Sequence, residues 1–128
     1  MLMAGEKSER ARAMFSLAIA ADPRGVSYYL TRAGLEMRQP TPDPGEVKAD
    51  YQRALTIDPQ NVLARLDYAD VLIKLHDPLA AAEQYRLALA TNAQYHEDEP
   101  KRLPPARVKE IEASIEKLAP SSATATQR

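Results

Sequence analysis

The sequence predicts an all-α protein built from repeated antiparallel helix pairs, and three observations support this fold class. Apolar residues recur at helical spacing along the 128 residues, whereas no segment alternates apolar and polar residues for long. The ten prolines fall between the periodic stretches, where they can begin or end helices without interrupting them. Finally, three segments share one spaced pattern of residues, which is the mark of a repeat architecture.

Six helices are expected between these prolines, over residues 7–21, 27–38, 44–57, 62–75, 78–91 and 105–118. Two of them begin with an aspartate followed by a proline. Asp43 can accept hydrogen bonds from the first backbone N–H groups of a helix, Pro44 fits its first turn, and Glu46 follows the cap by three residues. Asp77 and Pro78 repeat the first two features before the fifth helix. The local sequence therefore predicts where these two helices start.

The connections between helices are short except for residues 94–104, which are charged and contain prolines. The acidic and then basic residues of this segment indicate a self-neutralising spacer that places the last helix on the others. A recognition loop is the alternative. Residues 1–119 are expected to form one domain. Residues 120–128, rich in Ser, Thr and Ala, are expected to be a disordered tail.

One pattern occurs three times, with an aromatic residue, an alanine three residues later, and a pair that ends the helix. The copies are Ala11-xxx-Phe15-xx-Ala18-xxx-Asp22-Pro23, Val47-xxx-Tyr51-xx-Ala54-xxx-Asp58-Pro59 and Ala81-xxx-Tyr85-xx-Ala88-xxx-Asn92-Ala93. The aromatic residues are 36 and then 34 residues apart. We place the two extra residues of the longer unit in the turn from Pro40 to Asp43. Each full unit also has a small residue near the middle of its first helix, which is Ala69 in the second unit and either Ala33 or Gly34 in the first.

A 34-residue repeat with small residues where helices cross, an aromatic residue before an Ala-Leu pair and a closing Asp-Pro resembles the tetratricopeptide repeat (TPR). The segment from Tyr51 to Pro59, YQRALTIDP, is similar to the family's second-helix ending, and the resemblance covers residues 11–95. In the last copy Asn92-Ala93 replaces Asp-Pro, which fits a helix that continues into a non-repeat connection. The resemblance implies a short right-handed solenoid of antiparallel helix pairs. Its parts would be a half repeat over residues 7–26, repeats over 27–61 and 62–95, and a capping helix over 105–118.

Two of the expected helices differ in the width of their apolar faces. Helix 62–75 is apolar over well over half of its circumference, so it needs neighbours on two sides, as inside a solenoid. Helix 105–118 has a single narrow apolar stripe, and the rest of its surface is Arg, Lys, Glu and Ser. The stripe consists of Val108, Ile111, Ile115 and Leu118. This pattern is typical of a terminal helix that covers a stack and presents a polar outer face.

The composition argues against several function classes. The net charge is −1, without the basic surplus of a nucleic-acid-binding protein, and the absence of cysteine excludes disulfides and thiolate zinc sites. No glycine-rich phosphate loop or nucleophile elbow occurs. The run from His96 to Glu99 could bind a metal, but we interpret it as a solvated loop because charged runs usually stay exposed. We therefore expect a protein that is not an enzyme and has no catalytic, cofactor or metal site.

The TPR resemblance implies that the chain binds a protein or peptide in a concave groove lined by the first helix of each unit. The groove residues would be Tyr28, Leu35 and Arg38 in the first full unit, and Leu63, Asp67, Asp70 and Lys74 in the second. Asp70 and Lys74 are four residues apart, so an ordinary helix-surface pair worth about 0.3 kcal/mol is the alternative for them. The paired lysines and asparagines with which some family members clamp a C-terminal carboxylate have no counterparts here, which disfavours capture of a chaperone tail.

Helix 7–21 matches the second helix of a unit whose first helix is missing. Two and a half units are fewer than the roughly three that an independent solenoid needs. Its apolar face, which includes Met14, Phe15 and Leu17, is therefore expected to be an end-on interface. Two explanations stay open. Either two chains pair there as a homodimer, or the sequence is the tail of a longer protein whose earlier part covers the face, which we favour slightly.

The segment from Asn92 to the last helix is similar to repeat tails that follow membrane glycan ligases or polymerases in some bacteria. This resemblance offers an alternative to a free scaffold or adaptor, namely an accessory or assembly domain of a larger bacterial protein. No window approaches the roughly 20 apolar residues of a membrane span, so we expect no direct membrane insertion of this chain. The expected location is the cytoplasm, or the soluble part of a membrane-anchored protein.

Overall fold

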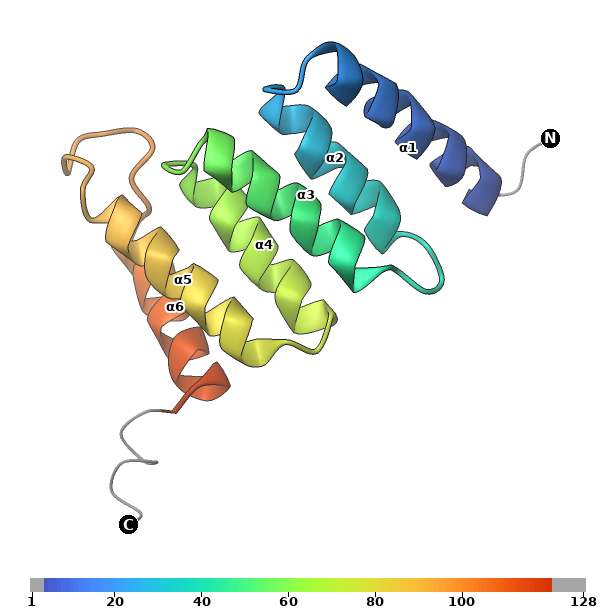
Figure 1. Cartoon of the computed structure of the whole chain (residues 1–128). Coiled ribbons are helices and arrows are strands. Elements are labelled where there is room, and N and C mark those ends of the chain that lie inside the picture. The colour runs from blue at the N-terminus through green and yellow to red at the C-terminus, as the bar shows by residue number, and fades with distance from the viewer. Residues whose placement is uncertain (1–3, 121–128) are drawn as a thin grey trace. The chain divides into compact units, whose positions relative to one another are not determined.

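The structure is a computed structural model that describes residues 4–120, and these residues form six α-helices and no strand (Figure 1). The helices are α1 (Ala4–Ala21), α2 (Val26–Met37), α3 (Pro44–Ile57), α4 (Val62–Lys74), α5 (Pro78–Asn92) and α6 (Pro105–Leu118). The predicted all-α fold class is confirmed, and each expected helix is present within a few residues of its expected bounds. The predicted disordered tail lies, from residue 121 onward, outside the described residues.

The helices divide into two compact units, Met1–Asn61 and Val62–Arg128. In the first unit α1 packs against α2 and α2 against α3, and in the second α4 packs against α5 and α5 against α6. Within each unit, helices that follow one another in the sequence are thus neighbours in space. This packing of adjacent helix pairs is compatible with a helical repeat.

Two fully buried alanines fix the alignment between the first helices of the two full repeats. Ala33 in α2 and Ala69 in α4 are both 0% exposed, whereas Gly34 is only half-buried and has open space where a Cβ would be. Ala33 is therefore the small residue that corresponds to Ala69. From here on, corresponding residues of two helices are called counterparts. Counterparts in α2 and α4 are 36 residues apart, as are those in α1 and α3. Counterparts in α3 and α5 are 34 residues apart.

The turn between α2 and α3 contains the two extra residues of the longer repeat. Residues 38–43 connect these helices, whereas residues 75–77 suffice between α4 and α5, where α4 also continues one residue past the counterpart of Met37. Asp43 ends the longer turn as the N-cap of α3, and its Oδ1 accepts hydrogen bonds from the backbone N–H of Gly45 (2.9 Å) and Glu46 (3.3 Å). The expected cap is confirmed, and it satisfies two N–H groups that a helix start leaves without partners.

The shorter turn closes α4 with a left-handed residue. His76 has φ 63°, a conformation that is costly for residues other than glycine. The backbone N–H of Asp77 donates to the carbonyl of Leu72 (2.9 Å) and that of His76 to Ile73 (3.0 Å), which is the Schellman arrangement of a helix end. Asp77 then caps α5 as expected, accepting a hydrogen bond from the N–H of Ala80 (3.4 Å).

The second unit has an apolar core to which all three of its helices contribute. The buried core residues are Val62, Leu66, Ala69, Tyr85, Ala88 and Ile111, with Leu89, Tyr95, Leu103, Ile115 and Leu118 packed against them. Ile111 of α6 is 0% exposed, so the predicted apolar stripe of this helix is turned into the core. Helix α5 lies between α4 and α6 and has packed neighbours on two sides.

Polar contacts hold the long connection after α5 against the end of that helix. Asn92 is 3% exposed, and its Oδ1 accepts a hydrogen bond from the backbone N–H of Leu103 (2.7 Å). The guanidinium of Arg102 donates to the carbonyl of Asn92 (3.3 Å) and to that of Tyr95. These contacts return the chain to α5 before α6 begins, as the spacer interpretation requires.

Candidate functional site: the open face of α1

The residues predicted to line a groove belong to the two separate units. In the first unit Tyr28 and Leu35 of α2 are half-buried, and Arg38, which follows this helix, is exposed. Tyr28 packs against Phe15 of α1, with ring centroids 6.3 Å apart. A Cβ at Gly25 would lie 2.3 Å from a ring carbon of Tyr28, so this ring takes the space that only a glycine leaves.

The four predicted groove residues of the second unit are all exposed on α4, and Leu63 is 71% exposed. Asp70 has a partner on the next helix, because its Oδ1 accepts a hydrogen bond from the hydroxyl of Tyr85 (2.5 Å). Burial, and then this bond to a carboxylate, raise the pKa of Tyr85 to about 12. Asp70 therefore ties α4 to α5, a role that differs from the helix-surface pair with Lys74 considered from the sequence.

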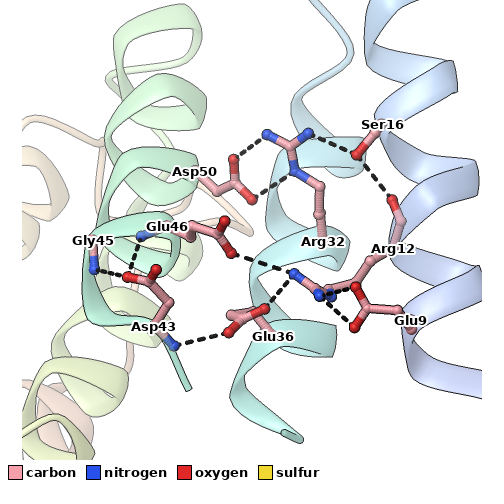
Figure 2. A network of polar contacts seen from close by, with 9 residues as sticks. All are labelled: Glu9, Arg12, Ser16, Arg32, Glu36, Asp43, Gly45, Glu46 and Asp50. Atoms are coloured by element: carbon pink, nitrogen blue, oxygen red, sulfur yellow. Dashed lines mark hydrogen bonds and ion pairs between the residues drawn. The ribbon is translucent and has the colours of Figure 1, made fainter. Parts of the chain in front are cut away.

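The first unit contains a network of charged residues around a cavity of about 380 Å³ (Figure 2). The cavity is lined from α1, α2 and α3 by Glu9, Arg12, Ala13, Ser16, Arg32, Glu36, Glu46, Ala49 and Asp50. Four carboxylates face two guanidinium groups, which leaves a formal charge of −2 on the lining. Figure 2 shows that both guanidinium groups lie among these carboxylates.

Arg12 joins α1 to the other two helices of the unit. Its guanidinium donates to both carboxylate oxygens of Glu9 (2.5 and 2.6 Å), to Glu46 (3.3 Å), and forms an ion pair with Glu36. The hydrogen bond to Glu9 raises the pKa of Arg12 and lowers the pKa of Glu9, because it favours the charged form of each group. All these partners are therefore linked through one fixed positive charge.

Arg32 makes the second link, with the fork geometry that suits a carboxylate. Its Nε and Nη2 donate to the two oxygens of Asp50 (2.9 and 2.6 Å), and its Nη1 donates to Ser16 Oγ on α1 (3.1 Å). The bond to Asp50 raises the pKa of Arg32. Asp50 is 6% exposed, so Arg32 neutralises a carboxylate that has almost no access to water.

Glu36 connects the network to the turn before α3. It is 5% exposed, pairs with Arg12, and accepts a hydrogen bond from the backbone N–H of Asp43 (2.8 Å). In the part of the chain that the structure describes, no three His, Asp or Glu side chains are grouped so that they could hold a metal ion. Because Arg12 of α1 pairs with Glu36 of α2 and Glu46 of α3, the network acts as a clamp that fixes α1 on these two helices.

None of these charged residues was predicted to form a site, although the alignment of α2 with α4 contains a signal for them. With Ala33 matched to Ala69, Arg32 is the counterpart of Tyr68 and Glu36 the counterpart of Leu72. Tyr68 and Leu72 are buried, at 3% and 1% exposure. Two charged residues at positions that are apolar core in the other repeat predict a polar contact, but only once the register is known.

Helix α1 has the repeated pattern of α3 and α5, but no helix among residues 4–120 covers it as α2 covers α3. The pattern positions of α3 and α5 are buried, with Tyr51 and Tyr85 at 2% and 4% exposure and both following alanines at 1% or less. Their counterparts in α1, Phe15 and Ala18, are both partly exposed, and so is Ala11 at the start of the pattern. Within its unit α1 packs against α2, whereas α5 packs against both α4 and α6.

Met14 marks the uncovered side of α1 most clearly, because it is 65% exposed. Its counterparts in the full repeats are Asp50 and Gln84. Each of them contacts an arginine of its own first helix, since Asp50 binds Arg32 and the Oε1 of Gln84 accepts from Arg65 (2.9 Å). In both full repeats the first helix therefore covers the residue that corresponds to Met14. We call the surface of Ala11, Met14 and Ala18 the open face of α1.

The other two residues predicted for an end-on interface are placed differently. Leu17 is 66% exposed, but its counterparts Arg53 and Leu87 are exposed too, so an outward direction is normal at this position. Phe15 is turned toward α2 through its contact with Tyr28. Of the three predicted residues, Met14 alone is exposed where both full repeats have a contact with their first helix.

Comparison of the chain with protein-family models and with curated proteins finds no match. Within residues 4–120, no helix combines the length and the apolar character needed to cross a membrane. The structure itself is an all-α chain whose adjacent helices are packed in pairs, as in a helical repeat.

Proposed function

We propose that the chain is a non-catalytic interaction module of TPR type that binds a partner protein through the open face of α1. One observation carries this proposal. Met14 is 65% exposed, whereas Asp50, its counterpart in α3, is 6% exposed and is covered by Arg32 of the first helix. A position that the repeat normally covers is thus exposed in the part of the chain that the structure describes.

The energetics of the open face support binding. Burying a methionine side chain is worth roughly 1.5–3 kcal/mol, and the alanines on either side add apolar area. The charged clamp of Arg12 and Arg32 holds α1 in place before any partner arrives, so little ordering of this helix opposes association. In this proposal the six helices form a right-handed solenoid, α6 is its C-terminal cap, and the chain serves as a scaffold or adaptor.

The groove side of α4 is a second candidate surface, favoured by one specific observation. Leu63 is 71% exposed, and the exposed side chains of Asp67 and Lys74 lie on the same helix. An apolar side chain beside charges of both signs is typical of a polar-rimmed contact. This surface would serve a peptide ligand, as the TPR resemblance implies.

Site-specific photo-crosslinking in cells distinguishes the two surfaces. A photoreactive amino acid is placed at Met14, at Leu63, or at Arg53, which is exposed on α3 and serves as the control. The proposal expects a specific cross-linked partner from position 14, and none from position 53. A partner obtained from position 63 and not from position 14 would move the contact to the groove.

Affinity capture with exposed-residue variants gives an independent measure. Met14→Glu places a charge on the open face and should abolish capture of the partner, with unchanged helix content by circular dichroism. Asp67→Lys and Lys74→Glu invert charges on the groove side and should leave capture intact. Retention of the partner by Met14→Glu would contradict the proposal.

A further inference from the structure

We infer that the occupant of the open face is an amphipathic α-helix of a partner protein, antiparallel to α1, with an apolar residue rather than an arginine opposite Met14. This inference rests on the proposed function and names the chemistry of its partner. The occupant would take the place that α2 takes on α3 and that α4 takes on α5. Both of these pairs are joined by short turns, so their helices run in opposite directions (Figure 1).

The small residues of the open face indicate a helix as the occupant. In α5 the counterparts of Ala11 and Ala18 are Ala81 and Ala88, and both are 0% exposed in a helix that packs against α4. Small side chains at this spacing allow a second helix to approach closely, with its ridges of side chains in the grooves of the first. The covering helices have a small residue of their own, Ala33 or Ala69, at 0% exposure.

Met14 determines which side chain the occupant can present. Asp50 and Gln84 are hydrogen-bond acceptors, and each receives a guanidinium from the first helix of its repeat. The thioether of Met14 is only a weak acceptor, so an arginine opposite it would be desolvated without a comparable hydrogen bond. An apolar side chain fills the same space and adds burial. The open face therefore selects helices that present no cation opposite Met14.

A second copy of the chain fits this requirement poorly. The helices of this chain that carry the complementary pattern are α2 and α4, and the alanines through which they cross, Ala33 and Ala69, are already fully buried. A second copy could offer only its own open face, in which Met14 stands alone as a large side chain. Self-association is therefore an outcome that the test has to exclude.

A helix taken from the chain itself provides the probe. A fluorescein-labelled peptide of residues 62–75 carries Arg65 at the position that contacts Gln84 in the second unit. A lactam bridge between Asp67 and a lysine introduced by Leu63→Lys, at two exposed positions of α4 that are four residues apart, holds the peptide helical. Its matched control contains Arg65→Leu. Circular dichroism establishes that both peptides are helical before fluorescence anisotropy measures their binding to the full chain.

We expect the wild-type chain and its Met14→Glu variant to prefer opposite members of this pair of peptides. The wild-type chain should bind the Arg65→Leu peptide at least about tenfold more tightly than the Arg65 peptide, the effect of one unpaired buried polar group. Met14→Glu places a carboxylate at the position where Gln84 accepts a hydrogen bond from Arg65, so it should bind the Arg65 peptide more tightly than the Arg65→Leu peptide. Leu17→Glu is the matched control, and its charge at an outward position should change either affinity by less than about twofold.

The failures of the inference and of the proposed function are distinguishable. If position 14 cross-links a partner protein but neither helical peptide binds, the contact is on α1 and its occupant is not a helix of this type. If both peptides bind and Met14→Glu leaves their order unchanged, they bind elsewhere and the inference is wrong. A dimer at tens of micromolar in light scattering that Met14→Glu dissociates would make a second copy the occupant and overturn it.

Discussion

The two units of the molecule share the same pattern of helices, but the residues beside the buried alanine are charged in the first unit and apolar in the second. On one side of the fully buried alanine, α2 has Arg32 and Glu36, which pair with Asp50 and Arg12. At the counterpart positions α4 has Tyr68 and Leu72, which are 3% and 1% exposed. The comparison shows that the backbone arrangement of the repeat does not require an apolar crossing.

The difference follows from how much water each crossing excludes. Helix α5 is packed between α4 and α6, and Ile111 of α6, at 0% exposure, belongs to the same apolar core as the crossing residue Ala69. Helix α1 has α2 as its packed neighbour, and the side chain of Arg12 beside the cavity keeps 19% exposure. The first unit accommodates these charges because they are paired and several of them stay partly hydrated. Burying the same charges in the core of the second unit would cost several kcal/mol.

The largest expected effect comes from removing one charge of the first unit. Arg32→Ala leaves the carboxylate of Asp50, 6% exposed, without its two hydrogen bonds, and should lower the free energy of unfolding by about 3–5 kcal/mol. Chemical denaturation followed by circular dichroism measures the loss. A cost below about 1 kcal/mol would mean that Asp50 gains hydration easily and that the crossing is not truly buried.

A double variant sharpens the same point. Arg32→Tyr together with Asp50→Gln installs the two residues that the second unit has at these positions, Tyr68 and Gln84. Because a buried ion pair can often be replaced at little net cost, the double variant should recover most of the stability that Arg32→Ala loses. If it is as unstable as the single variant, the crossing of the first unit depends on its charges and the two units are not interchangeable.

A smaller effect concerns the second unit, whose contribution to the free energy of unfolding should depend on pH in the alkaline range. The pKa of Tyr85 is raised from 10 in the unfolded chain to about 12 in the folded one. The unfolded state therefore loses this proton first, and stability that is complete below pH 10 should fall by about 2–3 kcal/mol as the pH rises to 12. Tyr85→Phe should remove this dependence, while Tyr28→Phe in the first unit should keep it. An unchanged pH profile in Tyr85→Phe would assign the alkaline loss to other groups.

The smallest expected effect concerns the two turns. The turn of the first unit is tied to the charged network through the bond from the Asp43 N–H to Glu36, whereas that of the second unit holds His76 at φ 63°. His76→Gly removes the strain of a left-handed residue at a helix end and should raise the free energy of unfolding by up to about 1 kcal/mol. Thermal unfolding checks this result. A lower melting temperature would show that the imidazole makes a contact that outweighs the strain.

Much of the fold could be predicted from the sequence because its signals are local. Proline positions, the caps Asp43 and Asp77, and the periodicity of apolar residues all act within one helix, and the six helices appear where they indicate. The pattern of Phe15, Tyr51 and Tyr85 also placed three helices, α1, α3 and α5, in corresponding positions of the sequence. These features need no knowledge of which helices touch.

Part of the candidate site could be found in the same way and part could not. The sequence identified Met14 as apolar on an unpaired helix, but periodicity alone did not separate it from Leu17 and Phe15. Exposure in the folded chain separates them, because Leu17 points outward as its counterparts do and Phe15 packs against Tyr28. The groove residues of α2 and α4 stay predictions.

By itself the sequence determined an all-α chain of paired helices, with its breaks, caps and repeating aromatic and alanine positions, since these depend on residues close together in the chain. Only the tertiary structure decided that Ala33 rather than Gly34 is the crossing residue, and that Arg12 and Arg32 meet carboxylates from other helices. Such pairs are far apart in sequence and depend on register, because a shift of one residue turns a helical side chain by about 100°. The open face of α1 is known only through that register.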